Sequence, residues 1–378
     1  GAAAPGTGWS GAAPAADGGP HRPWRGDVPP ARSRATRAAT MSAATPPAPM
    51  SSEAAFPRAA TTKHPPLRRR RTPLWAWGSF VVAAAIAAPV LAVLAAAAVP
   101  AGAVLAHIAG TTLPEMLADS FLLALLVGLM TASAGAVSAW LVTAFDFRGR
   151  GVLEVALLLP LAMPAYVCGY AYVWLLDVAG PVQTALRNLT GLRWGEYWFP
   201  EIRTLPGAAL MLAMVLYPYV YMLCRAAFLQ QSVCLIEASR TLGHGLARTF
   251  LHVALPLARP ALAGGVALAL METLADFGTV QHFAVRTLTT GIYEAWFGLG
   301  DRGAASQLAA CLMGLVALLL LFERLTRGGR RYHPTTTRHP PMRPVPLRGA
   351  KAALAFLACA MPVLLGFGVP ASALLWLA

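Results

Sequence analysis

The sequence predicts an all-α fold, a polytopic helical bundle in a membrane, on three observations. Of its 378 residues, 57% are hydrophobic and 12% are charged, whereas about 25% are charged in an ordinary soluble domain. Apolar stretches long enough to cross a hydrocarbon core of about 30 Å recur along the chain. The alternating pattern of a membrane barrel is missing, so helices are the elements that can satisfy their own backbone groups in lipid.

The first 72 residues stand outside this predicted bundle. They are rich in Ala, Pro, Gly, Ser and Arg and show no apolar periodicity, a composition typical of disordered segments. We interpret residues 1–72 as a disordered extension that includes residues upstream of the true start, with Met41 and Met50 as candidate starts. The alternative is a transit peptide, which has a similar Arg-rich, acid-poor composition.

Seven membrane spans are expected after this extension. Each is an apolar run bounded by polar or charged residues, and the run of four arginines at 68–71 directly precedes the first. The expected spans are 74–98, 121–145, 152–176, 206–228, 260–280, 304–322 and 352–376.

The positive charges predict the orientation. Setting aside the first 72 residues, 14 Lys and Arg lie on the side of the loops 146–151, 229–259 and 323–351, with Arg225 at the end of the fourth span included, against 5 in the loops on the other side. Lys and Arg accumulate on the cytoplasmic side of membrane proteins. We therefore expect these three loops and the N-terminus to be cytoplasmic.

The net charge of +14 does not indicate nucleic-acid binding, because the charges lie at span ends and no aromatic-basic motif accompanies them. The five cysteines are widely spaced and mostly within apolar runs, which is typical of small core residues. The eight histidines are scattered, so no metal site is expected. The sequence has no G-x-x-x-x-G-K-[ST] phosphate loop, so we expect no ATP hydrolysis by this chain and no cofactor bound to it.

The outer loop 177–205 contains Val182, Leu186 and Leu189 at helical spacing. This pattern predicts an amphipathic helix along the outer membrane face. Such a helix could receive a soluble partner or be an inert interfacial helix, and the pattern fits both.

The cytoplasmic loop 233–257 holds the most informative pattern. A short helix is expected through Leu242, ended by Gly243 in the left-handed conformation that glycine adopts without steric cost. A second short helix begins near Leu246 and is broken by Pro256. A surface-lying connection on the bilayer is the alternative on amphipathicity alone. The motif residues are Glu237, Ala238, Ser239, Gly243, Val253, Leu255 and Pro256.

This arrangement resembles the coupling loop of permease subunits in binding-protein-dependent ABC importers. The resemblance implies a type I transmembrane domain whose loop inserts into a cleft of a cytoplasmic ATPase dimer, the subunit that binds ATP and Mg. Ser239 stands where Ala is commonest in that family, and Val253 where Ile is commonest.

Residues 199–229 and 272–309 look like the ferric iron (Fe3+) transport permease family. This resemblance implies a multi-pass inner-membrane permease, not an enzyme, that passes ferric iron delivered by a periplasmic iron-binding protein. Permeases for thiamine, polyamine and sulfate share the scaffold and remain alternatives. An ion-driven secondary transporter, which would need no ATPase, is a more remote one.

The ferric branch usually carries two homologous halves in one chain. We expect a first permease domain at 73–328, a cytoplasmic linker between the halves at 329–350, and the first helix of a truncated second half at 351–378. The Pro-Val-Leu at 362–364 repeats that at 89–91 and indicates that a repeat begins again.

Two acids, Glu272 and Asp276, lie within the apolar span 260–280. Four residues apart on one helix, they are expected to share a face in the outer half of the bilayer. Ionisable groups at such depth face the bundle interior or a water-filled cavity. The pair is a candidate for lining the translocation pathway, with hydrogen-bonded contacts between helices as the alternative.

Overall fold

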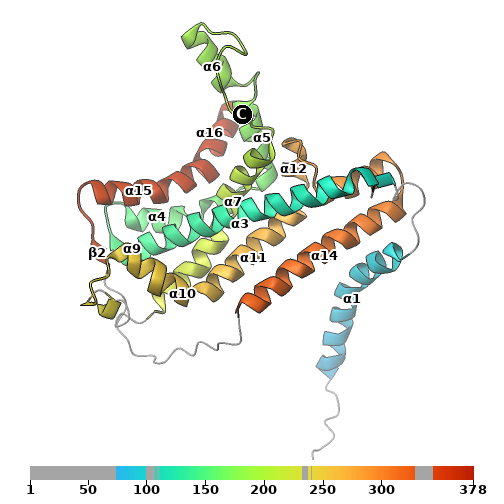
Figure 1. Ribbon diagram of the computed structural model, residues 1–378, viewed down its shortest axis with the longest axis horizontal. Coiled ribbons are helices and arrows are strands. Elements are labelled where there is room, and N and C mark those ends of the chain that lie inside the picture. Colours follow the sequence, from blue (N-terminus) through green and yellow to red (C-terminus); the bar gives the residue numbers. More distant parts are fainter. Residues whose placement is uncertain (1–73, 99–106, 109, 232–236, 240, 328–343) are drawn as a thin grey trace, which may run out of the picture. The chain divides into compact units, whose positions relative to one another are not determined.

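A computed structural model describes residues 74–98, 107–108, 110–231, 237–239, 241–327 and 344–378. The expected extension 1–72 lies outside the described residues, as does most of the expected linker 329–350. The described part of the chain is predominantly helical, as the sequence predicts (Figure 1).

Within the described ranges, the main elements are the helices of nine residues or more. They are α1 (Leu74–Ala97), α3 (Leu113–Ala144), α5 (Ala165–Leu176), α6 (Pro181–Thr190), α7 (Leu205–Leu229), α11 (Arg259–Ala275), α14 (Arg302–Arg327), α15 (Ala350–Val363) and α16 (Val369–Leu377).

Shorter elements connect them. These are α4 (Arg150–Ala156), the 3-10 helix η1 (Leu159–Ala162), α9 (Leu246–Thr249), the π-helix η2 (Phe250–Ala254), α10 (Leu255–Leu257), α12 (Gly278–His282), α13 (Leu288–Tyr293) and the π-helices η3 (Glu294–Gly298) and η4 (Leu364–Gly368). A two-residue parallel pairing joins β1 (Phe145–Asp146) to β2 (Val345–Pro346).

Six elements of the described chain are long and apolar enough to cross a membrane, and a bent helix pair raises the number to seven. Helices α1, α3, α7 and α14 and the α15–α16 segment correspond to five of the expected spans, with ends that differ by several residues. The expected number of seven is reached only when the bent pair is one span.

The expected continuous span 152–176 is wrong. The structure divides it into α4, η1 and α5. Pro160 lies at the start of η1 and Pro164 precedes α5. Since proline lacks a backbone N–H and its ring excludes the preceding helical turn, a regular helix cannot run through both positions. The membrane-length element here is instead α5 with α6, residues Ala165–Thr190.

The expected span 260–280 is also interrupted. Helix α11 ends at Ala275, and Asp276 has extended backbone angles, φ −71° and ψ 128°. At the other end, the segment Leu246–Leu257 meets α11 with a bend of 76°. Pro256 lies within the last turn before this bend rather than ending the helix itself.

Helix α7 is the centre of the core, because small residues let two helices approach it closely. A Cβ at Gly135 of α3 would lie 2.6 Å from the Cβ of Val220, and one at Gly265 of α11 would lie 2.6 Å from its Cα. Close backbone approach at small residues is how helices pack in membranes, where burial of apolar surface gives little driving force. Helices α3, α7 and α11 therefore form one packed unit.

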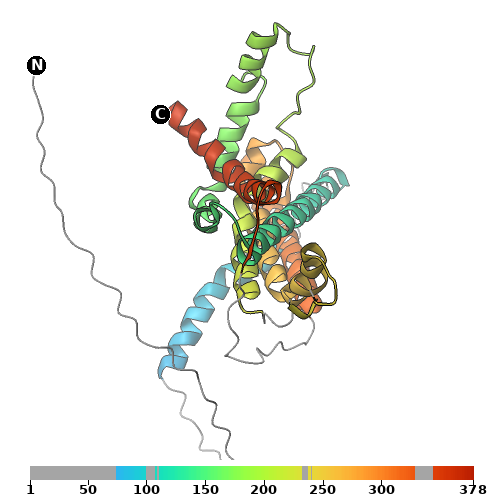
Figure 2. The same cartoon turned by 90° about the vertical axis from the view of Figure 1, so that its left-hand side faces the viewer.

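The C-terminal segment packs into this unit. A Cβ at Gly366 would lie 2.2 Å from the Met214 carbonyl oxygen of α7, and the Tyr172 hydroxyl of α5 donates to the Leu365 carbonyl. Figure 2 shows α16 beside α5, where the rings of Trp174 and Trp376 meet edge to face. The segment expected to begin a second half thus packs against the first half. By contrast, none of the residues in the membrane-length part of α1 is buried.

Candidate functional site

The loop that the positive charges predict to be cytoplasmic has the two-armed form expected for it. Residues 237–239 and 241 are helical, and Gly243 has a φ of +82°, in the left-handed region. Helix α9 begins at Leu246 and continues through η2 and α10 to Leu257. We name residues 237–258 the coupling loop, with a first arm before Gly243 and a second arm after Gly245.

Buried hydroxyl groups hold the two arms together. The Ser239 Oγ lies 3.0 Å from the Thr249 Oγ1 and 3.3 Å from the His244 Nδ1. Ser239 is 5% exposed and Thr249 is fully buried. The departure from Ala at position 239 therefore has a structural role, because its hydroxyl joins the arms.

The motif residues divide into two groups by exposure. Glu237, Ala238 and Gly243 are exposed, and the neighbouring Leu242 is 77% exposed. Val253, Leu255 and Pro256 are half-buried, on the side of the loop that meets the bundle. The first arm therefore presents a free surface, while the end of the second arm forms part of the packing.

An aromatic cluster anchors the second arm to the bundle. The ring of Phe250 lies 5.5 Å from that of Trp140 on α3 and 6.3 Å from that of Phe228 on α7, measured between centroids. Trp140 and Phe228 are 5.5 Å apart. In addition, the Gln231 Nε2 donates to the Ala254 carbonyl at 2.8 Å. A displacement of this arm must therefore displace α3 and α7.

The helix expected to carry both Glu272 and Asp276 ends between them, which corrects the expectation of one continuous helix. Glu272 lies on α11 and is exposed, whereas Asp276 follows the end of that helix. The Asp276 carboxylate accepts hydrogen bonds from the Thr279 N–H and Oγ1–H, both at 2.8 Å. The Asp276 carboxylate is therefore held at the break that follows α11.

The two acids consequently have different surroundings. Asp276 caps the turn that begins α12, and its own carbonyl accepts from the Thr289 hydroxyl at 3.0 Å. Glu272 lies within electrostatic range of the Tyr219 hydroxyl on α7. Among the described residues, no group of three or more His, Cys, Asp or Glu could hold a metal ion. Asp276 thus has a structural role, while Glu272 has an exposed side chain on α11.

Comparison with known proteins decides the family. Residues 124–327 match the family described as "Binding-protein-dependent transport system inner membrane component". The chain belongs to this family. The matched residues contain the coupling loop and both acids, so these features belong to the permease domain that the family defines.

Several curated permeases are similar to this one. The Fe(3+)-transport system permease protein FbpB 2 of Haemophilus influenzae is 27% identical over 220 residues, 58% of this chain and 39% of that protein. The molybdenum transport system permease protein ModB of Escherichia coli K12 is 30% identical over 203 residues, 52% of this chain and 86% of that one. The sulfate transport system permease protein CysT of Salmonella typhimurium is 30% identical over 208 residues, 52% and 71% of the two chains. The match thus spans well under half of the ferric permease.

Solved structures agree on the fold. A chain of a bacterial alginate ABC transporter, in complex with a periplasmic protein bound to an alginate pentasaccharide, superposes with a TM-score of 0.53. It is 13% identical in sequence, and the match covers 67% of this chain and 94% of that one. At this identity the likeness shows the fold of a permease subunit and nothing of the substrate.

The permease also has a second aromatic cluster, which was not predicted from the sequence. Phe277 stacks on Tyr293 at 4.5 Å between centroids, and Tyr293 lies 4.8 Å from Phe297. The Arg302 guanidinium lies 5.4 Å from the centre of the Trp296 ring. The signal in the sequence is the spacing of aromatics along 293–297, but their meeting with Phe277 depends on the chain turn between α12 and α13. This second cluster lies next to Asp276 in the chain, through Phe277.

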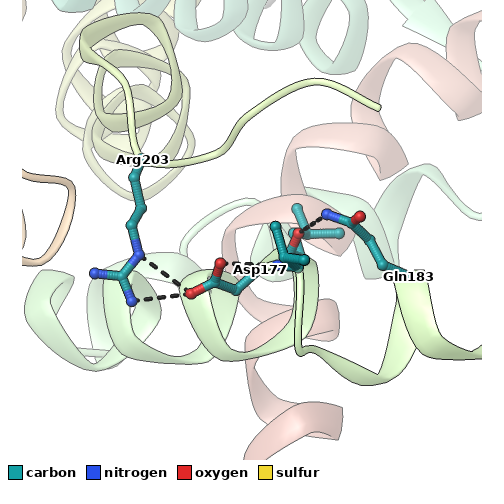
Figure 3. Close-up of polar contacts among 5 residues, drawn as sticks. Asp177, Gln183 and Arg203 are labelled. Atoms are coloured by element: carbon teal, nitrogen blue, oxygen red, sulfur yellow. Dashed lines mark hydrogen bonds and ion pairs between the residues drawn. The ribbon is translucent and has the colours of Figure 1, made fainter. Parts of the chain in front are cut away.

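A polar cluster fixes the connection between α5 and α6 of the permease, shown in Figure 3. The Asp177 Oδ2 accepts from the Arg203 Nη2 at 2.9 Å and from its Nε at 3.2 Å. The Gln183 Nε2 donates to the Leu176 carbonyl, and its Oε1 accepts from the Tyr197 hydroxyl. These bonds tie the middle and the end of loop 191–204 to the connection between α5 and α6.

This arrangement confirms that the segment containing Val182, Leu186 and Leu189 is helical, since α6 covers all three. In Figures 1 and 2, α6 lies beyond the end of α5, away from the rest of the bundle. Leu189, Trp194 and Trp198 are 86%, 71% and 87% exposed. The α6 region therefore offers an apolar surface at the end of the permease.

A groove of the described chain lies elsewhere, between α3, α11 and α14, with a volume of about 970 Å³. Apolar side chains such as Leu125, Leu270 and Leu319 line most of it, and Arg259 and Glu323 also contribute. Neither Glu272 nor Asp276 lines this groove. Its apolar walls suit acyl chains or another helix rather than a hydrated ion.

Proposed function

We propose that this chain forms the translocation pathway of an ATP-driven importer for ferric iron, delivered by a soluble periplasmic binding protein and driven by a separate cytoplasmic ATPase dimer. In this proposal the full-length chain supplies a second permease half and lies in the bacterial inner membrane with its N-terminus in the cytoplasm. ATP and Mg bind to the ATPase, and the permease itself is not an enzyme.

The observation that carries the proposal is the two-sided character of the coupling loop. Its first arm exposes Glu237 and Leu242, and on the second arm Leu251 is 56% exposed. Its other side is rooted in α3 and α7 through Phe250. An exposed apolar helix with a charged neighbour suits insertion into a groove of a partner protein. The rooted side is suited to carry the resulting movement into the membrane helices.

Ferric iron is favoured as substrate by the position of Glu272. It lies 13 residues into α11, about 20 Å along the helix from Arg259 at 1.5 Å per residue. A carboxylate at this depth attracts cations and repels oxyanions, and the ferric permease of Haemophilus influenzae is among the relatives of this chain. The cost of placing an ionisable group so deep supports a functional role for it.

Import of an oxyanion is the second candidate. The molybdenum and sulfate permeases match over 86% and 71% of their own lengths. Moreover, Asp276 uses its carboxylate to accept hydrogen bonds from Thr279. These hydrogen bonds leave the negative charge of Asp276 in place but offset part of its field, so the electrostatic argument for iron depends mainly on Glu272.

Reconstituted transport distinguishes these candidates. The full-length chain would be assembled with its ATPase in proteoliposomes, and uptake of radiolabelled ferric iron, molybdate and sulfate would be measured with the corresponding binding proteins. We expect ATP-dependent uptake of iron only. Uptake of molybdate or sulfate alone would replace iron by an oxyanion, and uptake that needs no ATPase would reject the importer. A catalytically inactive ATPase is the control.

A further inference from the structure

Helix α3 contacts both the coupling loop and a distant group of short helices at its other end. We name residues 276–301, which include α12, α13 and η3, the distal cap. Within α3, Ser120 and Trp140 are separated by 20 residues, about 30 Å along a helix and close to the thickness of a hydrocarbon core. Figure 1 shows α3 as one continuous helix, with α9 near its last turn.

At the loop end, Trp140 is the contact residue. It is 4% exposed and packs against Phe250 of the second arm and Phe228 of α7. Aromatic pairs at such separations contribute beyond the burial of their area. The indole therefore transmits a displacement of the arm to α3 without an intervening flexible segment.

At the cap end, three contacts lie within two turns of α3. The Ser120 Oγ accepts a hydrogen bond from the Leu288 N–H at 2.9 Å, in a buried position. A Cβ at Gly291 would lie 2.5 Å from the Met116 sulfur, so helix and cap meet closely there. Arg286 and Glu115 form a looser ion pair at 3.7 Å. Side chains of α3 thus hold the start of α13.

The covalent route between loop and cap is less rigid. It passes along α11, which meets the loop at a bend of 76° and ends at the extended residue Asp276. A bend and an extended residue are positions where backbone dihedrals can absorb a displacement. Helix α3 has no proline in its interior and no break. It is therefore the stiffer connection, although it is remote from the loop in sequence.

We propose that Ser120 and Trp140 are positioning residues for transport, through which α3 carries movement of the coupling loop to the distal cap. The cap includes Asp276, whose carbonyl accepts a hydrogen bond from Thr289 of α13. Movement of the cap therefore changes the surroundings of the end of α11, the helix that carries Glu272. The proposal rests on the proposed function, in that it requires an ATPase to move the loop.

The test uses the assembled transporter with one reporter at each end of α3. The exposed Cys311 and Cys234, which lies outside the described residues, would be replaced by serine, and His282→Cys on the cap or Ala247→Cys on the loop would be introduced. Both His282 and Ala247 are exposed. The rate of labelling by a thiol reagent would be compared between the nucleotide-free complex and the complex trapped with ATP and vanadate.

We expect trapping to change the labelling rate of His282→Cys, and Ser120→Ala to reduce that change about 2- to 10-fold, the range that loss of one hydrogen bond permits. Ser133→Ala is the matched control, because Ser133 is an exposed serine of the same helix that bonds only its own Met130 carbonyl. Trp140→Leu should reduce the change as well, and Trp140→Phe should restore it by keeping a ring against Phe250.

The two reporters separate the possible failures. In the transporter without substitutions on α3, binding of the ATPase should slow the labelling of Ala247→Cys. If it does not, the proposed function itself is rejected. If it protects Ala247→Cys but trapping leaves His282→Cys unchanged, or Ser120→Ala and Ser133→Ala behave alike, the role of α3 is rejected while the proposed function stands. If the Trp140→Leu protein fails to assemble, the results for Ser120→Ala and Trp140→Phe decide whether the role of α3 is accepted or rejected.

Discussion

The hydroxyl groups of Ser239 and Thr249 lie 3.0 Å apart, although the residues belong to opposite arms of the coupling loop. Both are buried in an otherwise exposed part of the loop. Because Gly243 turns the chain between them with a φ of +82°, the loop is a compact unit with its own internal bond. Its shape is therefore set by the permease before any partner binds.

Removing the Ser239 hydroxyl should loosen this unit without changing its surface. Ser239→Ala introduces the residue that the resembling family uses most, so the docking shape is kept. Loss of one hydrogen bond costs about 0.5–1.5 kcal/mol, and we expect a 2- to 10-fold weaker affinity for the ATPase, measured by titration of the purified subunits. Ser306→Ala, which removes a hydroxyl bonded within α14, should have no effect. Equal affinities for both variants and the parent would show that the bond is inert.

Gly243 should tolerate no β-branched side chain, and the cause should be the backbone alone. A Cβ at Gly243 or Gly245 meets no atom within 4 Å, but only Gly243 has a positive φ. A left-handed residue with a Cβ costs about 1–2 kcal/mol. We expect Gly243→Val to reduce ATP-driven transport and co-purification of the ATPase, and Gly245→Val to leave both nearly unchanged. A similar loss in both variants would point to the docking surface rather than the turn.

Glu272 and Asp276 should have separable effects. Asp276→Ala removes the acceptor for Thr279, and loss of such a cap costs about 0.5–2 kcal/mol, so the melting temperature should fall. Asp276→Asn keeps an acceptor oxygen and should restore it. Glu272→Gln should leave the melting temperature unchanged and reduce iron uptake. Unimpaired uptake in Glu272→Gln would exclude this acid from the pathway.

The orientation inferred from the positive charges is tested at Ala247, an exposed residue of α9. In a background without accessible cysteines, Ala247→Cys should be labelled by an impermeant thiol reagent in inside-out vesicles and not in intact cells. The same reagent should give the opposite result with a cysteine at Trp198, which is 87% exposed in the loop after α6. Labelling of Ala247→Cys from outside intact cells would invert the topology.

The sequence by itself determined the membrane class, most of the spans and the two arms of the coupling loop. These depend on local properties: an apolar run such as Leu74–Ala97 is long enough to cross a bilayer wherever it packs, and Gly243 can turn the chain without help from its neighbours. The prolines at 160 and 164 were also visible, but their combined effect on the expected span 152–176 was not anticipated.

Only the tertiary structure decided which residues meet across these elements. Helix α11 ends before Asp276, whose carboxylate accepts hydrogen bonds from Thr279, and this end comes earlier than the apolar pattern predicts. The contacts of Trp140 with Phe250, and of Ser120 with Leu288, join residues far apart in the chain. Hydrophobic periodicity shows which face of a helix is buried but not which helix covers it, because that choice depends on the packing of all the helices together.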